Sequence, residues 1–152
     1  MISKPKIIPG IHLLFRRVDE ESGENEYLLH KRIGTNFFDG YYSVPGGHIE
    51  RYETPLECAM REAKEELGIT LKPNQLEVVN LIYRIKEKEG EVRPDLCFLI
   101  KQWKGTISNG EPKKHKKPEW YLISKFPNKM VPYVKQAIID IERGVFLTQS
   151  FC

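Results

Sequence analysis

The chain has 152 residues, the size of one globular domain with its own hydrophobic core. Its 24 lysines and arginines against 21 aspartates and glutamates give a net charge of +3, too slight to argue for nucleic-acid binding. No stretch approaches the roughly 18 apolar residues that span a bilayer, and three cysteines without metal-ligand spacing disfavour disulfides or zinc, so we expect one domain over residues 1–152 in a reducing cytoplasm.

The predicted elements alternate between strands and helices along the chain. Residues 7–17 and 26–32 read as strands around a polar turn, and residues 41–45 as a short strand that runs into a glycine pair. After a helix, described next, the predicted elements are a hairpin of strands 75–86 and 92–104, a strand at 119–123 and a helix from about 131 to 143. This order indicates an α+β fold.

The first helix has well-specified ends. Thr54 is a good N-cap, Pro55 suits the first helical position, and Glu57 completes a Thr-x-x-Glu capping box. Gly68 supplies the left-handed stop. Apolar residues at helical spacing predict a buried stripe of Leu56, Ala59, Met60, Ala63 and Leu67. In the last helix, the corresponding inward residues are Val134, Ala137, Ile138 and Ile141, followed by Gly144 as the stop.

Three glutamates on the first helix point away from that stripe. Glu62, Glu65 and Glu66 lie three and four residues apart, so their carboxylates share one helical face. Like charges at this spacing repel by about 0.2–0.5 kcal/mol per pair, which favours a compensating cation. Oxygen ligands of this kind suit Mg²⁺, although three such glutamates by themselves usually form a solvated face.

The surrounding pattern favours a metal site over a solvated face, because residues 47–69 resemble the Nudix hydrolase signature. The matching positions are Gly47, Glu53, Arg61, Glu62, Ala63, Glu65, Glu66, Gly68 and Ile69. The segments LLHKRIGTNFFDGYYSVPGG and EWYLISKFP look like those of MutT-like members, so the resemblance covers roughly residues 7 to 142. It implies the Nudix fold, an α/β/α sandwich with a mixed β-sheet between helices.

The resemblance also implies metal-dependent hydrolysis of a pyrophosphate bond in a nucleoside diphosphate linked to another group X. The cofactor would be Mg²⁺, with Mn²⁺ as an alternative. Glu65 and Glu66 correspond to the principal metal ligands, and Glu62 to a third ligand or the general base. The carbonyl of Gly46 is a further candidate ligand, because glycine permits close approach of the backbone.

Outside these ligands, Arg61 and Glu53 look like an ion pair that holds the loop against the helix. MutT-like enzymes often take an additional base or ligand from another loop, and Glu111 and Glu119 are the candidates, with Glu111 slightly favoured. Either carboxylate could equally be an ordinary surface residue.

Substrate contacts are expected from residues near the Pro-Gly-Gly entry and from nearby aromatic side chains. Ser43 corresponds to a base-contacting position, Phe37 and Trp120 could stack on a ring, and Lys31 and Arg32 could reach phosphates. For the two aromatic residues, core packing is at least as good an interpretation.

Subtype markers of the family are missing from the chain. Arg84 and Ile85 occupy the place of a proline associated with ADP-ribose hydrolases, and Phe37 stands where the coenzyme A subtype expects arginine. The remaining prediction is a nucleoside triphosphate-directed, MutT-like enzyme, including one for oxidised or noncanonical nucleotides, that yields nucleoside monophosphate and pyrophosphate.

Alternative functions stay open at this point. They are hydrolysis of another nucleotide conjugate (a dinucleotide, ADP-ribose or an RNA cap) and a noncatalytic module that senses a nucleotide. The lysine-rich run KKHKK at residues 113–117 motivates the RNA cap, although such runs are usually solvated loops. We expect a small-molecule nucleotide as partner, neither nucleic acid nor membrane, and a monomer or a homodimer.

Overall fold

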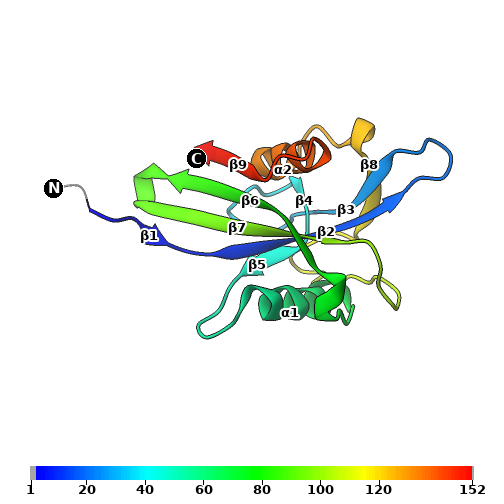
Figure 1. Cartoon of the computed structure of the whole chain (residues 1–152), viewed down its shortest axis with the longest axis horizontal. Coiled ribbons are helices and arrows are strands. Elements are labelled where there is room, and N and C mark those ends of the chain that lie inside the picture. The colour runs from blue at the N-terminus through cyan, green and yellow to red at the C-terminus, as the bar shows by residue number, and fades with distance from the viewer. Residues whose placement is uncertain (1–2, 152) are drawn as a thin grey trace.

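The computed structural model describes residues 3–151, in which a mixed β-sheet lies between two helices (Figure 1). The helices are α1 (Pro55–Leu67) and α2 (Pro132–Glu142). The strands in chain order are β1 (Lys6–Ile7), β2 (Gly10–Val18), β3 (Asn25–Lys31), β4 (Tyr42–Ser43), β5 (Gly46–His48), β6 (Glu77–Lys86), β7 (Glu91–Ile100), β8 (Glu119–Leu122) and β9 (Leu147–Phe151). The predicted α/β/α sandwich is therefore confirmed.

The sheet is built around the parallel pair of β2 and β7. Its order is β4-β3-β2-β7-β6-β9, with β1 on β7, β5 on β2 and β8 on β3 as additional pairings. Strands β6 and β7 form the predicted antiparallel hairpin, while β9 runs parallel to β6. Because β2 pairs with both a parallel and an antiparallel neighbour, the sheet is mixed.

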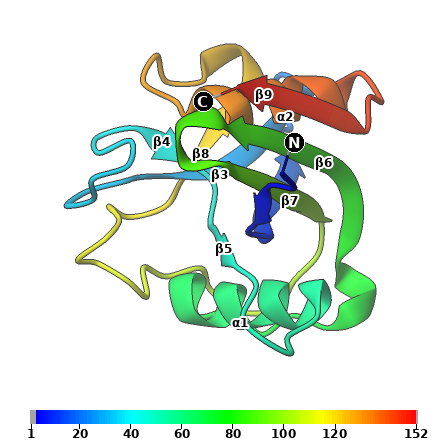
Figure 2. The ribbon, with the colours of Figure 1, turned by 90° about the vertical axis from the view of Figure 1, so that its left-hand side faces the viewer.

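Helices α1 and α2 lie on opposite faces of this sheet (Figure 2). A hydrophobic core lies under each of them. Strand β2 serves both, since Leu13 packs in the core beneath α1 and Leu14 in the core beneath α2, as the period of two in a strand requires. In α2, Val134, Ala137 and Ile138 are buried as predicted. Both faces of the sheet are thus covered, and the helices have fixed positions relative to it.

The ends of α1 follow the sequence prediction. Thr54 Oγ1 accepts a hydrogen bond from the Glu57 N–H at 3.2 Å, and Glu57 Oε1 accepts one from the Thr54 N–H at 3.3 Å. Gly68 ends the helix with φ at +70°. One expectation about this helix was wrong, because Leu56 is 38% exposed and the buried face instead includes Glu62 and Glu66. Packing against β2, β5 and a later loop turns these acids inward.

Other differences from the predicted elements lie at strand ends. Of the predicted strand 41–45, only Tyr42–Ser43 forms a strand, β4; Val44 and Pro45 follow it, since proline cannot donate to a ladder, and β5 beyond them was not predicted. Strand β7 ends at Ile100, and β1 and β9 were not predicted. Strand β9 is held in the sheet by tertiary contacts, among them a 3.1 Å hydrogen bond from Asn80 to Thr148.

Two further expectations concern the whole chain. Cys58 and Cys97 are buried and free of disulfides, whereas Cys152 lies outside the described residues. Among residues 3–151, neither helix has the length and apolar character needed to cross a membrane.

Candidate active site

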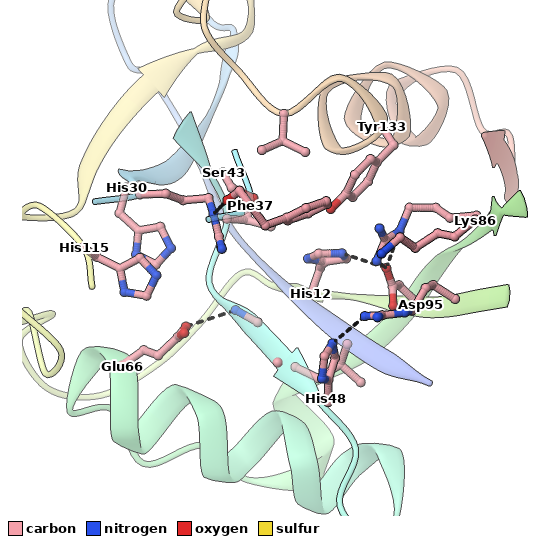
Figure 3. A pocket seen from close by; sticks show the side chains of 18 residues that line it. His12, His30, Phe37, Ser43, His48, Glu66, Lys86, Asp95, His115 and Tyr133 are labelled. Carbon is pink, nitrogen blue, oxygen red and sulfur yellow. Dashed lines mark hydrogen bonds and ion pairs between the residues drawn. The ribbon is translucent and has the colours of Figure 1, made fainter. Parts of the chain in front are cut away.

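A cavity of about 350 Å³ lies between the start of α2 and the C-terminal part of α1 (Figure 3). Strands β2 to β7 contribute to its walls. Glu66, His30 and His115 gather on one side of it, and Lys86 and Asp95 lie on the other (Figure 3). Its volume falls within the range of small-molecule sites.

The acidic side of the cavity contains a group of potential metal ligands. One ligand atom from each of Glu66, Glu111 and His115 lies within 4.8 Å of the others. Glu66 Oε2 accepts a 3.0 Å hydrogen bond from the Gly46 N–H, which fixes the carboxylate against β5. Glu66 comes from α1, whereas Glu111 and His115 come from the loop after β7.

The electrostatic surroundings of Glu66 disfavour an isolated negative charge. Burial, together with the charges of Glu62 and Glu111, raises the pKa of the Glu66 carboxyl to about 9, against the hydrogen bond from Gly46 and the charge of Lys114. A bound cation stabilises the ionised form of such a group. Two carboxylates and an imidazole form a donor set that fits a divalent ion, so the residues present fit a metal site.

The loop that carries Glu111 and His115 is docked on the end of α1. The Gly110 N–H donates to the Glu66 carbonyl at 2.8 Å, and both the N–H and the hydroxyl of Ser108 donate to the Leu67 carbonyl. A Cβ at Gly110 would collide with the backbone of Glu65, so only glycine allows this approach. The loop thereby satisfies carbonyls that the helix end leaves without partners.

The other carboxylates of the signature at residues 47–69 surround Arg61. Its guanidinium bonds Glu53 through Nε at 2.7 Å and Nη2 at 2.9 Å, so the predicted ion pair is present. Its Nη1 also donates to Glu62 at 2.9 Å and to Glu65 at 3.2 Å. The hydrogen bonds from Arg61 lower the pKa of Glu53 to about 2, whereas burial raises the pKa of Glu62. One cation thus compensates three carboxylates.

The side of the cavity away from Glu66 is rich in cationic groups. Arg84 donates twice to Asp95 Oδ2, at 3.0 and 2.9 Å, and its guanidinium lies 4.2 Å from the ring centre of Tyr133. His12 lies 3.3 Å from the same carboxylate. Burial raises the pKa of Asp95, but His12 and Arg84 outweigh it, and the carboxyl stays ionised with a lowered pKa. The sequence analysis did not place these residues in the site.

Comparison with known proteins decides the family. The family model of the NUDIX domain matches residues 13–140, which is most of the chain. The chain belongs to the Nudix family. The crystal structure of the MutT protein from Methanosarcina mazei Go1 has a TM-score of 0.73 at 20% identity, covering 94% of this chain and 97% of that one. The MutT NUDIX hydrolase from Burkholderia pseudomallei has a TM-score of 0.72 at 22% identity, covering 90% and 97%. These likenesses show a MutT-like Nudix fold.

A similarity in sequence to a curated Nudix relative is more local. The ADP-ribose pyrophosphatase of Methanocaldococcus jannaschii is 43% identical over 53 residues, which is 35% of this chain. The matched segment spans 31% of that relative's length.

Within this Nudix domain, the predicted site residues fall into two groups. Ser43, Arg32, Phe37 and Gly46 line the cavity together with Glu66. The Phe37 ring is 40% exposed and lies 5.6 Å from Lys86 Nζ, so it forms part of the rim. These residues are positioned where a bound ligand would contact them.

The second group lies outside the lining of the Nudix cavity. It includes the predicted residues at α1 and in the neighbouring loops, namely Glu53, Arg61, Glu62, Glu65 and Glu111. Trp120 stacks on Trp103 at 5.8 Å, with the Arg17 guanidinium 4.1 Å from its ring centre. Lys31 and Glu119 are also absent from the lining, although the Lys31 carbonyl accepts from the Lys116 N–H at 3.0 Å. The packing alternative weighed for Trp120 fits its surroundings.

The two loop carboxylate candidates differ in position. Glu111 is brought to Glu66, whereas Glu119 is exposed and its nearest polar contact is the Tyr121 hydroxyl at 3.3 Å. The sequence analysis missed His115 as a site residue. Its signal was a single histidine within a run of four lysines, and in the structure those lysines are exposed while His115 is buried.

Proposed function

We propose that this chain is a divalent-metal-dependent Nudix pyrophosphohydrolase whose substrates are nucleoside diphosphates linked to another group. The observation that carries the proposal is the pair of Glu66 and Glu111 beside a cavity that has cationic groups on its other walls. Metal-assisted hydrolysis of phosphate esters and anhydrides needs this combination of anionic ligands and cationic phosphate contacts.

The charges around the cavity suit a ligand that carries several phosphates. Arg32, Arg84, Lys86 and Arg93 line it, against the carboxylates of Glu66 and Asp95. Arg84 is neutralised by Asp95, while Arg32 and Lys86 lie near the Phe37 ring at the rim. A polyphosphate chain would therefore enter past cationic groups and reach the acidic side only with a compensating cation.

The chain's own residues have distinct tasks in this proposal. Glu66, held by the Gly46 N–H, and Glu111 are ligands, and Glu65 and Glu62 complete the set, with Glu62 also a candidate for the base. Arg61 positions Glu62 and Glu65 next to Glu66. A bound Mg²⁺ or Mn²⁺ would neutralise phosphate oxygens and make an attacking water more acidic. Hydrolysis then consumes one water and breaks one P–O–P linkage.

For the finer substrate class, we favour a nucleoside triphosphate, cleaved to nucleoside monophosphate and pyrophosphate. The MutT-like fold and the missing ADP-ribose proline support it, since Arg84 at that position is buried in its pair with Asp95. ADP-ribose is the second candidate, because a sequence relative carries the name ADP-ribose pyrophosphatase.

The test is a screen of the purified chain with Mg²⁺ and with Mn²⁺ over nucleoside triphosphates, oxidised nucleotides, ADP-ribose, dinucleotides, sugar nucleotides and capped RNA. We expect metal-dependent turnover that is highest for a nucleoside triphosphate, with pyrophosphate as product. If ADP-ribose were hydrolysed fastest, the proposed substrate class would be wrong, whereas hydrolysis of a pyrophosphate bond would stand. Tight nucleotide binding without turnover of any compound would contradict the enzyme and support the sensing module.

A further inference from the structure

His115 is a residue of the site that neither the catalytic motif nor the proposed reaction uses. It is 7% exposed, and a ring nitrogen lies within 4.8 Å of carboxylate oxygens of both Glu66 and Glu111. Among residues 3–151, no side-chain hydrogen bond is formed by either ring nitrogen. Because His115 lines the cavity, its ring is within reach of a ligand bound there.

The backbone holds His115 firmly in this place. Its N–H donates to the Glu111 carbonyl at 3.0 Å, and its carbonyl accepts from Asn109 Nδ2 at 2.8 Å. A bridge to Arg32 fastens the same residue to the end of β3. The ring is stacked on His30, with 3.8 Å between ring centres and 5° between planes. The imidazole is therefore oriented before any ligand arrives.

We propose that His115 supplies a nitrogen ligand to the divalent ion held by Glu66 and Glu111, and that this ligand makes the site prefer Mn²⁺ or a similar first-row transition ion to Mg²⁺. The inference deepens the proposed function and rests on its metal site. Imidazole suits transition ions, whereas Mg²⁺ prefers oxygen ligands throughout. Two carboxylates and one imidazole form a mixed donor set that discriminates between the two ions.

His30 has a supporting part in this arrangement. Its parallel stack restricts rotation of the His115 ring. The four lysines of the 113–117 run are exposed, although Lys114 Nζ pairs with Glu111 at 3.2 Å, whereas His115 is buried. One of its ring nitrogens thereby lies near two carboxylates, which packing alone does not require.

The first measurement uses the wild-type chain and needs no substitution. Mn²⁺ is titrated into the protein and examined by pulsed electron paramagnetic resonance, once with natural histidine and once with ¹⁵N-labelled histidine. We expect a nitrogen coupling that changes from the ¹⁴N to the ¹⁵N pattern. Bound Mn²⁺ without such a coupling would overturn the proposal.

The second measurement assigns the nitrogen and tests selectivity. In His115→Ala we expect the coupling to disappear and Mn²⁺ affinity by calorimetry to fall at least about tenfold, as for loss of even an outer metal partner. Mg²⁺ affinity should fall by a smaller factor. The matched control is His48→Ala, a cavity-lining histidine outside the ligand group, which should keep both coupling and affinity.

Failure of this inference can be separated from failure of the proposed function. Mn²⁺ binding that disappears in Glu66→Gln but is unchanged in His115→Ala would retain the metal site and overturn the role of His115. A wild-type chain that binds neither Mn²⁺ nor Mg²⁺ would overturn both. Should His115→Ala not fold by circular dichroism, His115→Asn and the labelled wild-type protein decide the same question.

Discussion

Two sides of helix α1 carry glutamates in opposite electrostatic situations. On the Arg61 side, Glu62 and Glu65 of the helix and Glu53 of the preceding loop all bond one guanidinium; the pKa of Glu53 falls to about 2, whereas burial raises that of Glu62. On the Glu66 side, within the described residues, Glu66 forms no ion pair, and its pKa rises to about 9. The two sides differ because Arg61 binds three carboxylates on one of them, whereas on the other Lys114 pairs with Glu111, at 3.2 Å, and not with Glu66.

This difference separates a structural role from a binding role. A carboxylate with a fixed guanidinium partner already has its charge compensated and serves to hold a loop. A buried carboxylate next to a second acid destabilises the folded chain unless a cation is supplied from outside. We therefore propose that the metal lies beside Glu66, that Glu62 and Glu65 reach it from the Arg61 side, and that Glu53 with Arg61 holds the loop.

The largest expected effect comes from removing the uncompensated charge. Glu66→Gln should lower turnover at least about a hundredfold, because a metal clamp on the transition state is lost. Without metal, the raised pKa of about 9 keeps this buried carboxyl protonated at neutral pH, a cost that glutamine removes, so the unfolding free energy in urea should not fall. Steady-state rates with saturating Mg²⁺ measure the first effect.

Glu65→Gln sharpens the same comparison. As a motif ligand it should also lower turnover at least about a hundredfold, although its side chain is exposed and bonds Arg61 in the absence of substrate. Near-normal rates in both variants, with folding intact, would remove the assignment of the metal to this helix. A normal rate in Glu65→Gln alone would confine the site to the Glu66 side.

The next largest effect is the loss of folding stability when Arg61 is replaced. Arg61→Gln leaves Glu53 and Glu62 without their main partner, so the unfolding free energy should fall by about 1–3 kcal/mol. Urea unfolding followed by fluorescence measures it. The matched control is Lys64→Gln, an exposed cation on the same helix, which should change stability by less than about 0.5 kcal/mol.

A smaller effect tests whether ligand contacts are confined to the cavity. Phe37→Ala should raise KM about fivefold, the lower end of what an aromatic stack on a base contributes, because this ring is partly exposed. Trp120→Ala should leave KM unchanged and lower stability, since Trp120 packs on Trp103. The reverse result would return Trp120 to the substrate site.

The smallest effect is a pH dependence of stability on the Arg61 side. The folded-state pKa of Glu53 is about 2, below the ordinary value of 4.5, so its contribution is present above pH 4.5 and is lost as the pH falls toward 2. In Glu53→Gln this part of the acid destabilisation should be missing. The urea midpoints of wild type and variant are measured across that pH range. If both midpoints fell equally with pH, Arg61 would not stabilise the Glu53 carboxylate.

Much of the fold could be predicted because local signals and tertiary packing agree. The capping box of Thr54 and Glu57, the stop at Gly68 and the apolar spacing in α2 depend on nearest neighbours along the chain. Strand β9 could not be predicted, since its short segment is a strand only beside β6. Leu56 was misplaced because the rotation of a helix depends on what packs against it.

The sequence by itself determined the family pattern, the helix that carries the acids, and the ion pair of Arg61 with Glu53, all of which depend on spacing within 23 residues. Only the tertiary structure decided which glutamate faces the cavity, that Glu111 and not Glu119 approaches it, and that His115 turns inward. The physical reason is distance along the chain. Glu66 and His115 meet because Gly110 lets a loop close on the helix end, and no local periodicity encodes that contact.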